Sequence, residues 1–566
     1  MKIKYTIVLM LAAIMAFAQQ THNVITVKDP STVPLSNEEK GEVLNGVIKN
    51  SSIYPGTTRS FQVLVPKGYD GCTPACLVLG LDGNLFGAIT VIDNLVKTGE
   101  MPMTIGVFLN PGVCYDESGK VARYNRSNEF DRTDDKLARF IEKEVLPEVE
   151  KMKTADGRAI LISKDANDRA ITGASSSGIA AFTVAWERSD MFSRVYSSVG
   201  TFVAMRGGNE YPAIVRKTEP KPIRIFLQDG VNDTWNHIFG DWWEYNQLMS
   251  SALNYAGYEF DYKWDRGGHS IYYGTRIYPD VMRWLWRGYP AQVRVGESMN
   301  DMLKKLIKKD TQWKELCDVD DDARLFALGA DKVLVAQDVE CKVMDTTGVV
   351  ISSHKVQKGR RVIGVGVDEN IITADASGVY ISSRKVASVK NAHTAQQLHD
   401  GRLYISTTGG DMYMVDKGGK QHKMTTLSTS DAAFAISPDN RLMVTSEKNS
   451  DWLISYVIKE NGEIEYGQQF YWLHNVNNHS HSAYGNIAYD TLGNVYAATP
   501  IGIQVCDHNG RVRAILPLKG RSVSSIAFSG KYIYAISGGK LYVREVLLEG
   551  YNAPQEKIDV KSQGAG

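Results

Sequence analysis

The pattern of hydrophobic residues in this chain of 566 residues changes near Tyr289-Pro290. Before this point, short apolar runs without alternation are separated by amphipathic stretches, as in a sheet that is buried on both faces. After it, short strands of alternating polarity are separated by Gly, Asn and Asp turns. Because a single hydrophobic core does not extend over so long a chain, the change predicts two domains of different class.

The first domain is predicted over residues 58–290 as a doubly wound α/β sheet. A long helix is expected from Asp135 to Met152, where apolar residues recur at helical spacing. Residues 19–57 are expected to form a lead-in segment, and the polar, Lys-rich residues 291–317 a linker. The predicted strands are 60–65, 76–81, 104–109, 169–173, 194–198, 223–228 and 258–264.

The second domain is predicted over residues 318–550. In it, a unit of one turn and one strand recurs at intervals of roughly 32 to 53 residues, which suits an all-β, six-bladed propeller. An all-β sandwich with coincidental similarity is the alternative. Residues 551–566 are expected to be a polar tail. The recurring units are 331–335, 369–373, 401–405, 440–444, 493–497 and 531–535.

Residues 1–18 are typical of a cleaved signal peptide. Lys2 and Lys4 precede an apolar run from Ile7 to Ala18, which ends in the Ala-Phe-Ala pattern that a signal peptidase needs. The run is too short to span a bilayer comfortably, and no cysteine follows the cleavage site. We therefore expect an exported protein, periplasmic or secreted, without a membrane anchor.

Charge and cysteine content exclude several classes of partner. Lys plus Arg number 64, as do Asp plus Glu, so no net field attracts nucleic acid. Six cysteines in so long a chain make no disulfide framework, although Cys72 and Cys76 could pair. No cysteine has zinc-ligand spacing. His474, His479 and His481 lie close together and could bind a transition metal, but we favour a polar surface loop. We expect neither a metal nor a cofactor.

Residues 169–178 read Arg-Ala-Ile-Thr-Gly-Ala-Ser-Ser-Ser-Gly, an apolar strand that runs into small residues and then into a helical stretch. This order is typical of a nucleophile elbow, in which a strand-to-helix turn presents a serine hydroxyl. Two frames fit, one centred on Ser175 and one on Ser176. We favour Ser175, because the strand that ends at Gly173 delivers it directly. A Ser/Gly-rich turn without catalysis is the alternative.

A serine needs a base and an oriented carboxylate to become a nucleophile. His269, in a Gly-Gly-His loop after a predicted strand, is the best base. Asp229 and Asp233 lie on one loop, and we prefer Asp233, because a turn can point it toward His269. The order Ser, Asp, His is that of α/β-hydrolases. The amides of Ser176 and Asn84 are expected to bind the oxyanion.

The motifs resemble the esterase family of α/β-hydrolases that contains enterochelin esterases, feruloyl and acetylxylan esterases, and mycolyltransferases. The resemblance covers about residues 45–290 and rests on the elbow, Leu-Asp-Gly83, Arg126-Ser-Asn-Glu129-Phe, Gly-Val-Asn-Asp233 and Gly-Gly-His269. It implies that Ser175, Asp233 and His269 form a triad. Family members usually have glycine where Ser177 stands.

Four further residues are candidates for substrate binding. Arg126 and Glu129 belong to one of the family motifs, and Trp242 and Trp243 lie between the acid and base loops. The two tryptophans could stack on a sugar or phenolic ring, and packing in the core is the alternative.

The second domain resembles the gluconolactonase and regucalcin family of six-bladed propellers, most clearly over residues 487–498 and 501–507. Those lactonases bind a divalent metal through Glu, Asn and Asp. Here Ala432 and Gly485 occupy two of the ligand positions, which leaves too few oxygen ligands for a hard cation. We therefore expect no lactonase activity.

These observations predict an exported serine esterase. The expected substrate is a feruloyl, acetyl or similar ester on a glycan, or a small aryl or siderophore ester. Two alternatives remain at this point: a metal-dependent lactonase in the propeller, and a glycan-binding protein without catalysis.

Overall fold

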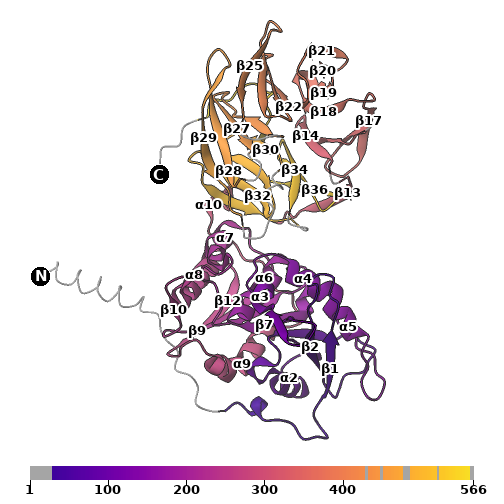
Figure 1. Ribbon diagram of the computed structural model, residues 1–566, viewed down its shortest axis with the longest axis vertical. Helices are drawn as coiled ribbons and strands as arrows, with labels where there is room; N and C mark the ends of the chain where they lie inside the picture. Colours follow the sequence, from indigo (N-terminus) through magenta and orange to yellow (C-terminus); the bar gives the residue numbers. More distant parts are fainter. Residues whose placement is uncertain are drawn as a thin grey trace, which may run out of the picture. The chain divides into compact units, whose positions relative to one another are not determined.

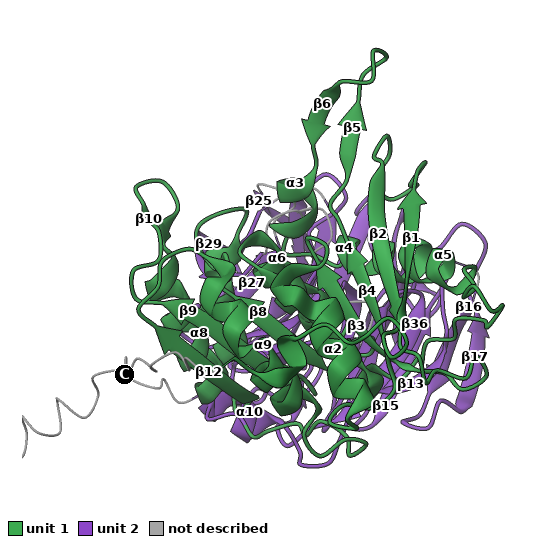
Figure 2. Ribbon diagram, turned by 90° about the horizontal axis from the view of Figure 1, so that it is seen from below, with its two compact units in different colours: residues 1–216, 220–297 green, residues 217–219, 298–566 purple. Residues whose placement is uncertain are grey.

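The computed structural model describes residues 28–320, 322–338, 340–427, 431–446, 450–475, 485–518 and 522–560. The predicted signal peptide, His479 and His481 lie outside the described residues. The chain divides into two compact units, shown in Figure 1 and coloured separately in Figure 2. Unit 1 comprises Met1–Arg216 and Pro220–Glu297, and unit 2 comprises Lys217–Glu219 and Ser298–Gly566.

A mixed sheet forms the centre of unit 1, and its strand order is β1-β2-β4-β3-β7-β8-β9-β12. In this order, the strands from β4 to β12 are parallel to one another. β2 runs antiparallel to β4, and the edge strand β1 runs antiparallel to β2. This confirms the predicted α/β architecture. The strands are β1 (Glu42–Ile48), β2 (Arg59–Val65), β3 (Cys76–Leu81), β4 (Thr104–Leu109), β7 (Arg169–Ala174), β8 (Arg194–Ser198), β9 (Arg224–Gly230) and β12 (Glu259–Asp265).

Helices cover both faces of this sheet (Figure 1). α2 (Ala88–Lys97) and α9 (Ile271–Trp286) share a core cluster with β3, β7 and β8 on one face. α6 (Ser176–Glu187) lies on the other face, and its residues from Ser176 to Trp186 are all buried. Its small side chains allow that close approach. The remaining helices are α3 (Arg126–Phe130), α4 (Lys136–Phe140), α5 (Leu146–Glu150), α7 (Tyr211–Lys217) and α8 (Trp242–Tyr255).

Short elements complete unit 1. A π-helical turn, η3 (Ile141–Val145), joins α4 to α5, so the predicted helix 135–152 is one continuous stretch with a local change of winding. Two hairpins connect larger elements: β5 (Val113–Tyr115) with β6 (Val121–Tyr124), and β10 (Trp235–Asn236) with β11 (Gly240–Asp241). The 3-10 turns are η1 (Pro30–Thr32), η2 (Leu85–Gly87), η4 (Ala166–Asp168) and η5 (Gly208–Glu210).

The expected lead-in segment 19–57 contains the first strand of the sheet. Among the described strands, β1 pairs with β2 alone. Most of its side chains alternate between half-buried and exposed positions, with Val47 56% exposed. Such an edge strand lacks the continuous apolar run that identified the central strands. The sheet therefore begins at residue 42, within the expected lead-in segment, and not at residue 60, where the first predicted strand starts.

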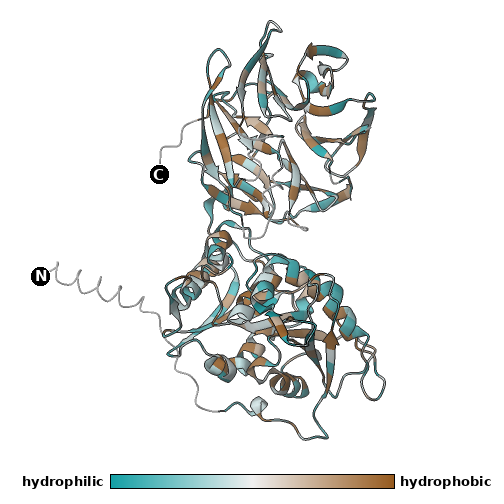
Figure 3. Ribbon diagram, in the orientation of Figure 1, coloured by the Kyte–Doolittle hydropathy of each residue, from teal (hydrophilic) through white to brown (hydrophobic). Residues whose placement is uncertain are grey.

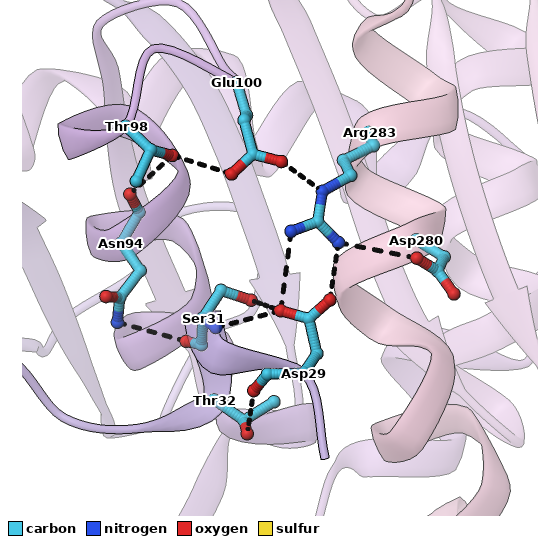
Figure 4. Close-up of polar contacts among 8 residues, drawn as sticks. All are labelled: Asp29, Ser31, Thr32, Asn94, Thr98, Glu100, Asp280 and Arg283. Atoms are coloured by element: carbon cyan, nitrogen blue, oxygen red, sulfur yellow. Dashed lines mark hydrogen bonds and ion pairs between the residues drawn. The ribbon is translucent and has the colours of Figure 1, made fainter. Parts of the chain in front are cut away.

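Residues 28–33 are held against α2 and α9 by polar contacts (Figure 4). The carboxylate of Asp29 accepts a hydrogen bond from Arg283 Nη1 of α9 at 2.7 Å. Asn94 of α2 donates from Nδ2 to the carbonyl oxygens of Ser31 and Val33, at 3.1 and 3.0 Å. These contacts attach the start of the described chain to unit 1.

We expect Arg283→Met to destabilise unit 1 by roughly 1 kcal/mol at neutral pH, because the ion pair is partly exposed. Burial raises the pKa of Asp29, but hydrogen bonds from Arg283 outweigh it and lower that pKa from 3.8 to about 2. The stabilisation of unit 1 by this ion pair is therefore present above pH 4 and is lost as the pH falls toward 2. Urea unfolding of both proteins between pH 7 and 3 should show the difference shrinking. Asp280→Asn, which removes only a 3.4 Å contact to Arg283, is the matched control and should match the wild type. A difference that is independent of pH would contradict this account.

Unit 2 is a six-bladed β-propeller, as predicted. Within the described residues, each blade is an antiparallel sheet of four strands, and one blade carries β37 as a fifth. The blades are β14–β17, β18–β21, β22–β25, β26–β29, β30–β33 with β37, and β34–β36 with β13. Because β13 precedes the first blade in sequence but pairs with β36 of the last, it closes the ring. Figure 3 shows hydrophobic and hydrophilic residues interspersed along these strands, as their alternation predicts.

The strand bounds explain the sequence repeat. Each recurring unit falls on the second strand of a blade: β15, β19, β23, β27, β31 or β35. The first three blades comprise β14 (Arg324–Leu328), β15 (Lys332–Ala336), β16 (Glu340–Met344), β17 (Val350–Lys355), β18 (Arg361–Val365), β19 (Ile371–Asp375), β20 (Gly378–Ile381), β21 (Arg384–Ala387), β22 (Ala392–Gln397), β23 (Leu403–Thr407), β24 (Asp411–Val415) and β25 (Gln421–Thr426), with the 3-10 turn η6 (Val367–Glu369) before β19. The others comprise β26 (Phe434–Ile436), β27 (Leu442–Ser446), β28 (Trp452–Ile458), β29 (Ile464–Trp472), β30 (Ile487–Asp490), β31 (Val495–Thr499), β32 (Gly502–Cys506), β33 (Val512–Leu516), β34 (Val523–Ser529), β35 (Tyr532–Ser537), β36 (Lys540–Glu545), β13 (Lys314–Asp318) and β37 (Gly550–Tyr551).

Both segments that were expected to flank the propeller contribute to it. Most of the expected linker 291–317 belongs to unit 2, because α10 (Asp301–Leu306) buries Leu303 and Leu306 in a propeller core cluster. The lysines of α10 lie on its other positions, so the Lys-rich composition concealed a buried face. The expected tail 551–566 likewise begins with buried residues, Tyr551 and Ala553.

Candidate active site

The predicted elbow lies between β7 and α6. Ser175 joins the strand to the helix with backbone angles φ 59° and ψ −123°. Residues other than glycine rarely adopt this conformation, which turns the chain sharply. Gly173 is required here, because a Cβ atom at this position would lie 2.1 Å from the carbonyl oxygen of Ser177. The structure therefore has the geometry of a nucleophile elbow centred on Ser175.

Ser177, where glycine is usual, fits the elbow through its hydroxyl group. The side chain is fully buried, and its Oγ accepts a hydrogen bond from the amide of Ala174 at 2.9 Å and donates to the carbonyl of Ala174 at 2.7 Å. The serine thus bridges the strand end to the first turn of the helix.

We expect Ser177→Ala to lower the free energy of unfolding by about 1–3 kcal/mol, because the amide of Ala174 is left buried without an acceptor. Chemical denaturation measures this loss, and Ser36→Ala at an exposed position is the control. Unchanged stability would show that the hydroxyl does not support the elbow.

A hydrogen-bonded chain connects three of the predicted residues. His269 Nε2 lies 2.8 Å from Ser175 Oγ, and His269 Nδ1 lies 2.7 Å from Asp233 Oδ1. Backbone bonds hold the two loops: the amide of Asp233 donates to Gly230 O at 2.9 Å, and that of Asn232 to Gly267 O at 3.0 Å. The acid and base loops, which follow the neighbouring strands β9 and β12, are thereby joined.

Asp233, and not Asp229, contacts the imidazole. Burial raises the pKa of Asp233, but its hydrogen bond with His269 and other contacts outweigh that effect and lower the pKa below the ordinary value. An ionised carboxylate at Nδ1 orients the ring so that Nε2 faces the serine and can accept its proton. The arrangement can therefore activate Ser175 as a nucleophile.

Thr201 also lies beside the serine, and sequence reasoning missed it. Its Oγ1 lies 3.3 Å from Ser175 Oγ and accepts a hydrogen bond from Trp242 Nε1 at 3.2 Å. The ring of Trp242 meets that of His269 edge to face, with centroids 5.6 Å apart. Trp242 is buried, so this edge contact limits the movement of the imidazole. Trp243 packs against Trp264 instead. The structure shows packing contacts for both tryptophans, and their stacking on a substrate ring stays a prediction.

A pocket of about 260 Å³ opens at the serine. Arg126 lines it, as expected, and binds the carboxylate of Asp82 through Nε at 2.8 Å and Nη2 at 2.6 Å. This two-point contact holds the guanidinium group in place. The other lining residues are Leu85, Ala174, Val199, His269, Ser270 and Ile271.

Glu129 does not reach this pocket, contrary to expectation. Its side chain is fully buried and forms an ion pair with the equally buried Arg59. It also accepts hydrogen bonds from Asn125 Nδ2 at 2.6 Å and from the amide of Gly112 at 3.2 Å. The motif therefore contains one pocket residue, Arg126, and one residue that stabilises the fold.

The two residues expected to bind an oxyanion lie near the serine. Ser176 begins α6 directly after Ser175 and is buried. Asn84 precedes η2, and its neighbours Asp82 and Leu85 both line the pocket. The Asn84 side chain points elsewhere, with Oδ1 accepting from the amide of Ile89 at 3.0 Å, so only its backbone is available for this purpose.

Other predicted features were also located. Cys72 is exposed and Cys76 is buried with Sγ 3.3 Å from the hydroxyl of Tyr289, so they do not pair. The propeller has a cavity of about 320 Å³ whose lining includes Gly485. In the part of the chain that the structure describes, no three His, Cys, Asp or Glu side chains gather as a metal site. No helix there is long and apolar enough to cross a membrane.

Residues 52–276 match the model of the Esterase family, described as "Putative esterase". Similar solved structures include a ferulic acid esterase, at 20% identity and TM-score 0.33 over 44% of this chain and 99% of that one. They also include an enterobactin esterase from Shigella flexneri, at 17% identity and TM-score 0.34 over 45% of this chain and 61% of that one. A gluconolactonase from Xanthomonas campestris matches at 11% identity and TM-score 0.35 over 44% of this chain and 93% of that one. No curated protein matches the chain. The N-terminal part of the chain is thus esterase-like in sequence.

Proposed function

We propose that this protein is a serine esterase that hydrolyses carboxylic esters through an acyl-enzyme. The observation that carries the proposal is the chain of hydrogen bonds from Asp233 through His269 to Ser175 at the mouth of a pocket. The match of the surrounding residues to an esterase family supports the same class of reaction.

In the proposed reaction, Ser175 Oγ attacks the ester carbonyl while His269 Nε2 accepts the hydroxyl proton. Asp233 stabilises the imidazolium ion, and the amides of Ser176 and Asn84 bind the oxyanion of the tetrahedral intermediate. His269 then donates the proton to the leaving alkoxide, and the acyl group stays on Ser175. Water, activated by His269, attacks this ester and regenerates the free serine.

The substrate and location are part of the proposal. We propose an ester of an aryl or acetyl group on a glycan, or a small aryl or siderophore ester, because these are the substrates of the family that the motifs resemble. Arg126 lines the same pocket as Ser175, and its guanidinium group can donate hydrogen bonds to an oxygen-rich substrate. The signal-like residues 1–18 support export to the periplasm or beyond.

Hydrolysis of p-nitrophenyl acetate, methyl ferulate and an acetylated xylan tests this function. Wild-type protein should release product from at least one ester, with no effect of EDTA. His269→Gln, which keeps the side-chain size but not the base, should lose that activity. Activity on lactones alone, abolished by EDTA and unaffected by His269→Gln, would overturn the proposal and point to the propeller.

A further inference from the structure

Asp229 lies directly behind the proposed acid. It is fully buried near the end of β9, and its Oδ1 accepts the amide of Gly230 at 2.8 Å. The turn after Gly230 brings Asp233 back toward it, and Asp233 Oδ1 accepts from His269 and from the amide of Thr234. In each carboxyl group, these hydrogen bonds involve Oδ1 and leave the other oxygen, Oδ2.

Neither of these two oxygens has a donor of its own. Asp229 Oδ2 and Asp233 Oδ2 are both buried and meet no donor nitrogen or hydroxyl among the described residues. Their carboxyl groups are in side-chain hydrogen-bond contact. Two acceptor oxygens cannot bond without a proton between them, so a hydrogen atom must lie on one of the two groups.

The surroundings decide which group carries this proton. Asp233 receives hydrogen bonds from His269 and Thr234, whereas Asp229 receives one from Gly230 alone. Burial raises the pKa of Asp229 well above its ordinary value, and the nearby charges of Asp233 and Asp265 raise it further. Asp265, at the end of β12, is itself bound by Gln228 Nε2 at 2.8 Å.

We propose that Asp229 is a protonated carboxylic acid that donates its O–H to Asp233 Oδ2 and thereby positions the acid of the triad. The inference rests on the proposed function, because the orientation of His269 matters only if His269 is the base. Asp229 is a positioning residue: it touches neither substrate nor reacting atoms. Its hydrogen bond keeps Asp233 from rotating, so that Oδ1 stays on His269 Nδ1, and it favours the ionised form of Asp233.

Two substitutions separate a neutral donor from a charge. Asp229→Asn keeps the shape, carries no charge and offers an N–H to Asp233 Oδ2, so it imitates the protonated acid. Asp229→Leu keeps the volume but offers no donor. Asp93→Asn is the matched control, because Asp93 is another buried aspartate of unit 1, on α2, that accepts a backbone amide, that of Gly41 at 2.7 Å.

The experiment measures kcat on an aryl ester and the titration of His269 by NMR of its ring protons, assigned through His269→Gln. We expect Asp229→Asn and Asp93→Asn to retain kcat within about threefold and to leave the pKa of His269 at its wild-type value. We expect Asp229→Leu to lower kcat by about tenfold to a hundredfold, because the imidazole is no longer held in register. It should also raise the pKa of His269, because Asp233 without its donor attracts the imidazolium more strongly.

Two results would overturn the inference. If Asp229 were ionised, Asp229→Asn would remove a negative charge and lower the pKa of His269. If Asp229 only filled space in the core, Asp229→Leu would match the wild type in kcat and in the titration curve of His269. Should Asp229→Leu fail to fold, the Asp229→Asn titration still decides. The titration needs no turnover, so it tests the carboxyl pair even if wild-type protein hydrolyses no ester and the proposed function fails.

Discussion

Ser175→Ala should lower kcat for ester hydrolysis by roughly three to six orders of magnitude, because it removes the hydroxyl group on which the proposed acyl-enzyme forms. Binding should change little, since the methyl group fits the space that the hydroxyl leaves. Any residual rate comes from the oxyanion site and from substrate positioning. The measurement is steady-state hydrolysis of the best aryl ester from the panel, with burst kinetics to follow the acyl-enzyme.

Ser250→Ala is the matched control for this substitution. Ser250 is a buried serine of α8 whose hydroxyl donates to the carbonyl of Gln247 at 3.0 Å, outside the pocket. It should leave kcat unchanged. If Ser175→Ala kept a tenth of the wild-type rate, Ser175 could not be the nucleophile.

Glu129→Gln should lower the free energy of unfolding by about 3–5 kcal/mol, because it leaves the guanidinium of Arg59 charged, buried and without a counter-ion. Both side chains of this pair are 0% exposed, and the ring of Phe140 lies 4.3 Å from the guanidinium carbon. Urea unfolding followed by circular dichroism measures the loss.

Kinetics of the folded Glu129→Gln protein separate this role from substrate binding. Because Glu129 does not reach the pocket, KM should stay at the wild-type value. The double substitution Arg59→Met with Glu129→Leu should recover much of the stability, since it removes both charges together. A raised KM with unchanged stability would instead place Glu129 at the substrate.

The central strands of unit 1 could be predicted closely because they are buried on both faces. β3, β4 and β8 have the predicted bounds. The apolar runs of β3 and β4 end at the polar residues Asp82 and Asn110. β1 and the two hairpins could not, because they are exposed or very short and their burial depends on partners distant in sequence. The propeller was predictable for a different reason: the second strand of each blade follows a similar turn, so repetition compensates for weak individual signals.

Some residues of the candidate site could likewise be predicted from the sequence, and others could not. The elbow and the Gly-Gly-His loop have local signatures, because the backbone itself needs small residues there. The sequence favoured Asp233 over Asp229 but could not decide between them, because the choice depends on the shape of the turn that carries both residues. The contact of Thr201 with Ser175, and the pairing of Glu129 with Arg59, join residues 26 and 70 positions apart. No local pattern indicates such contacts.

Labelling with a fluorophosphonate probe tests the central claim most directly, because rapid phosphonylation requires a serine activated by a neighbouring base. The adduct is located by mass spectrometry of proteolytic peptides, in wild-type protein and in His269→Gln. The account predicts a single adduct on Ser175 that forms rapidly in the wild type and at least about a hundredfold more slowly in His269→Gln. An adduct on another residue, or equal labelling rates in the two proteins, would contradict it.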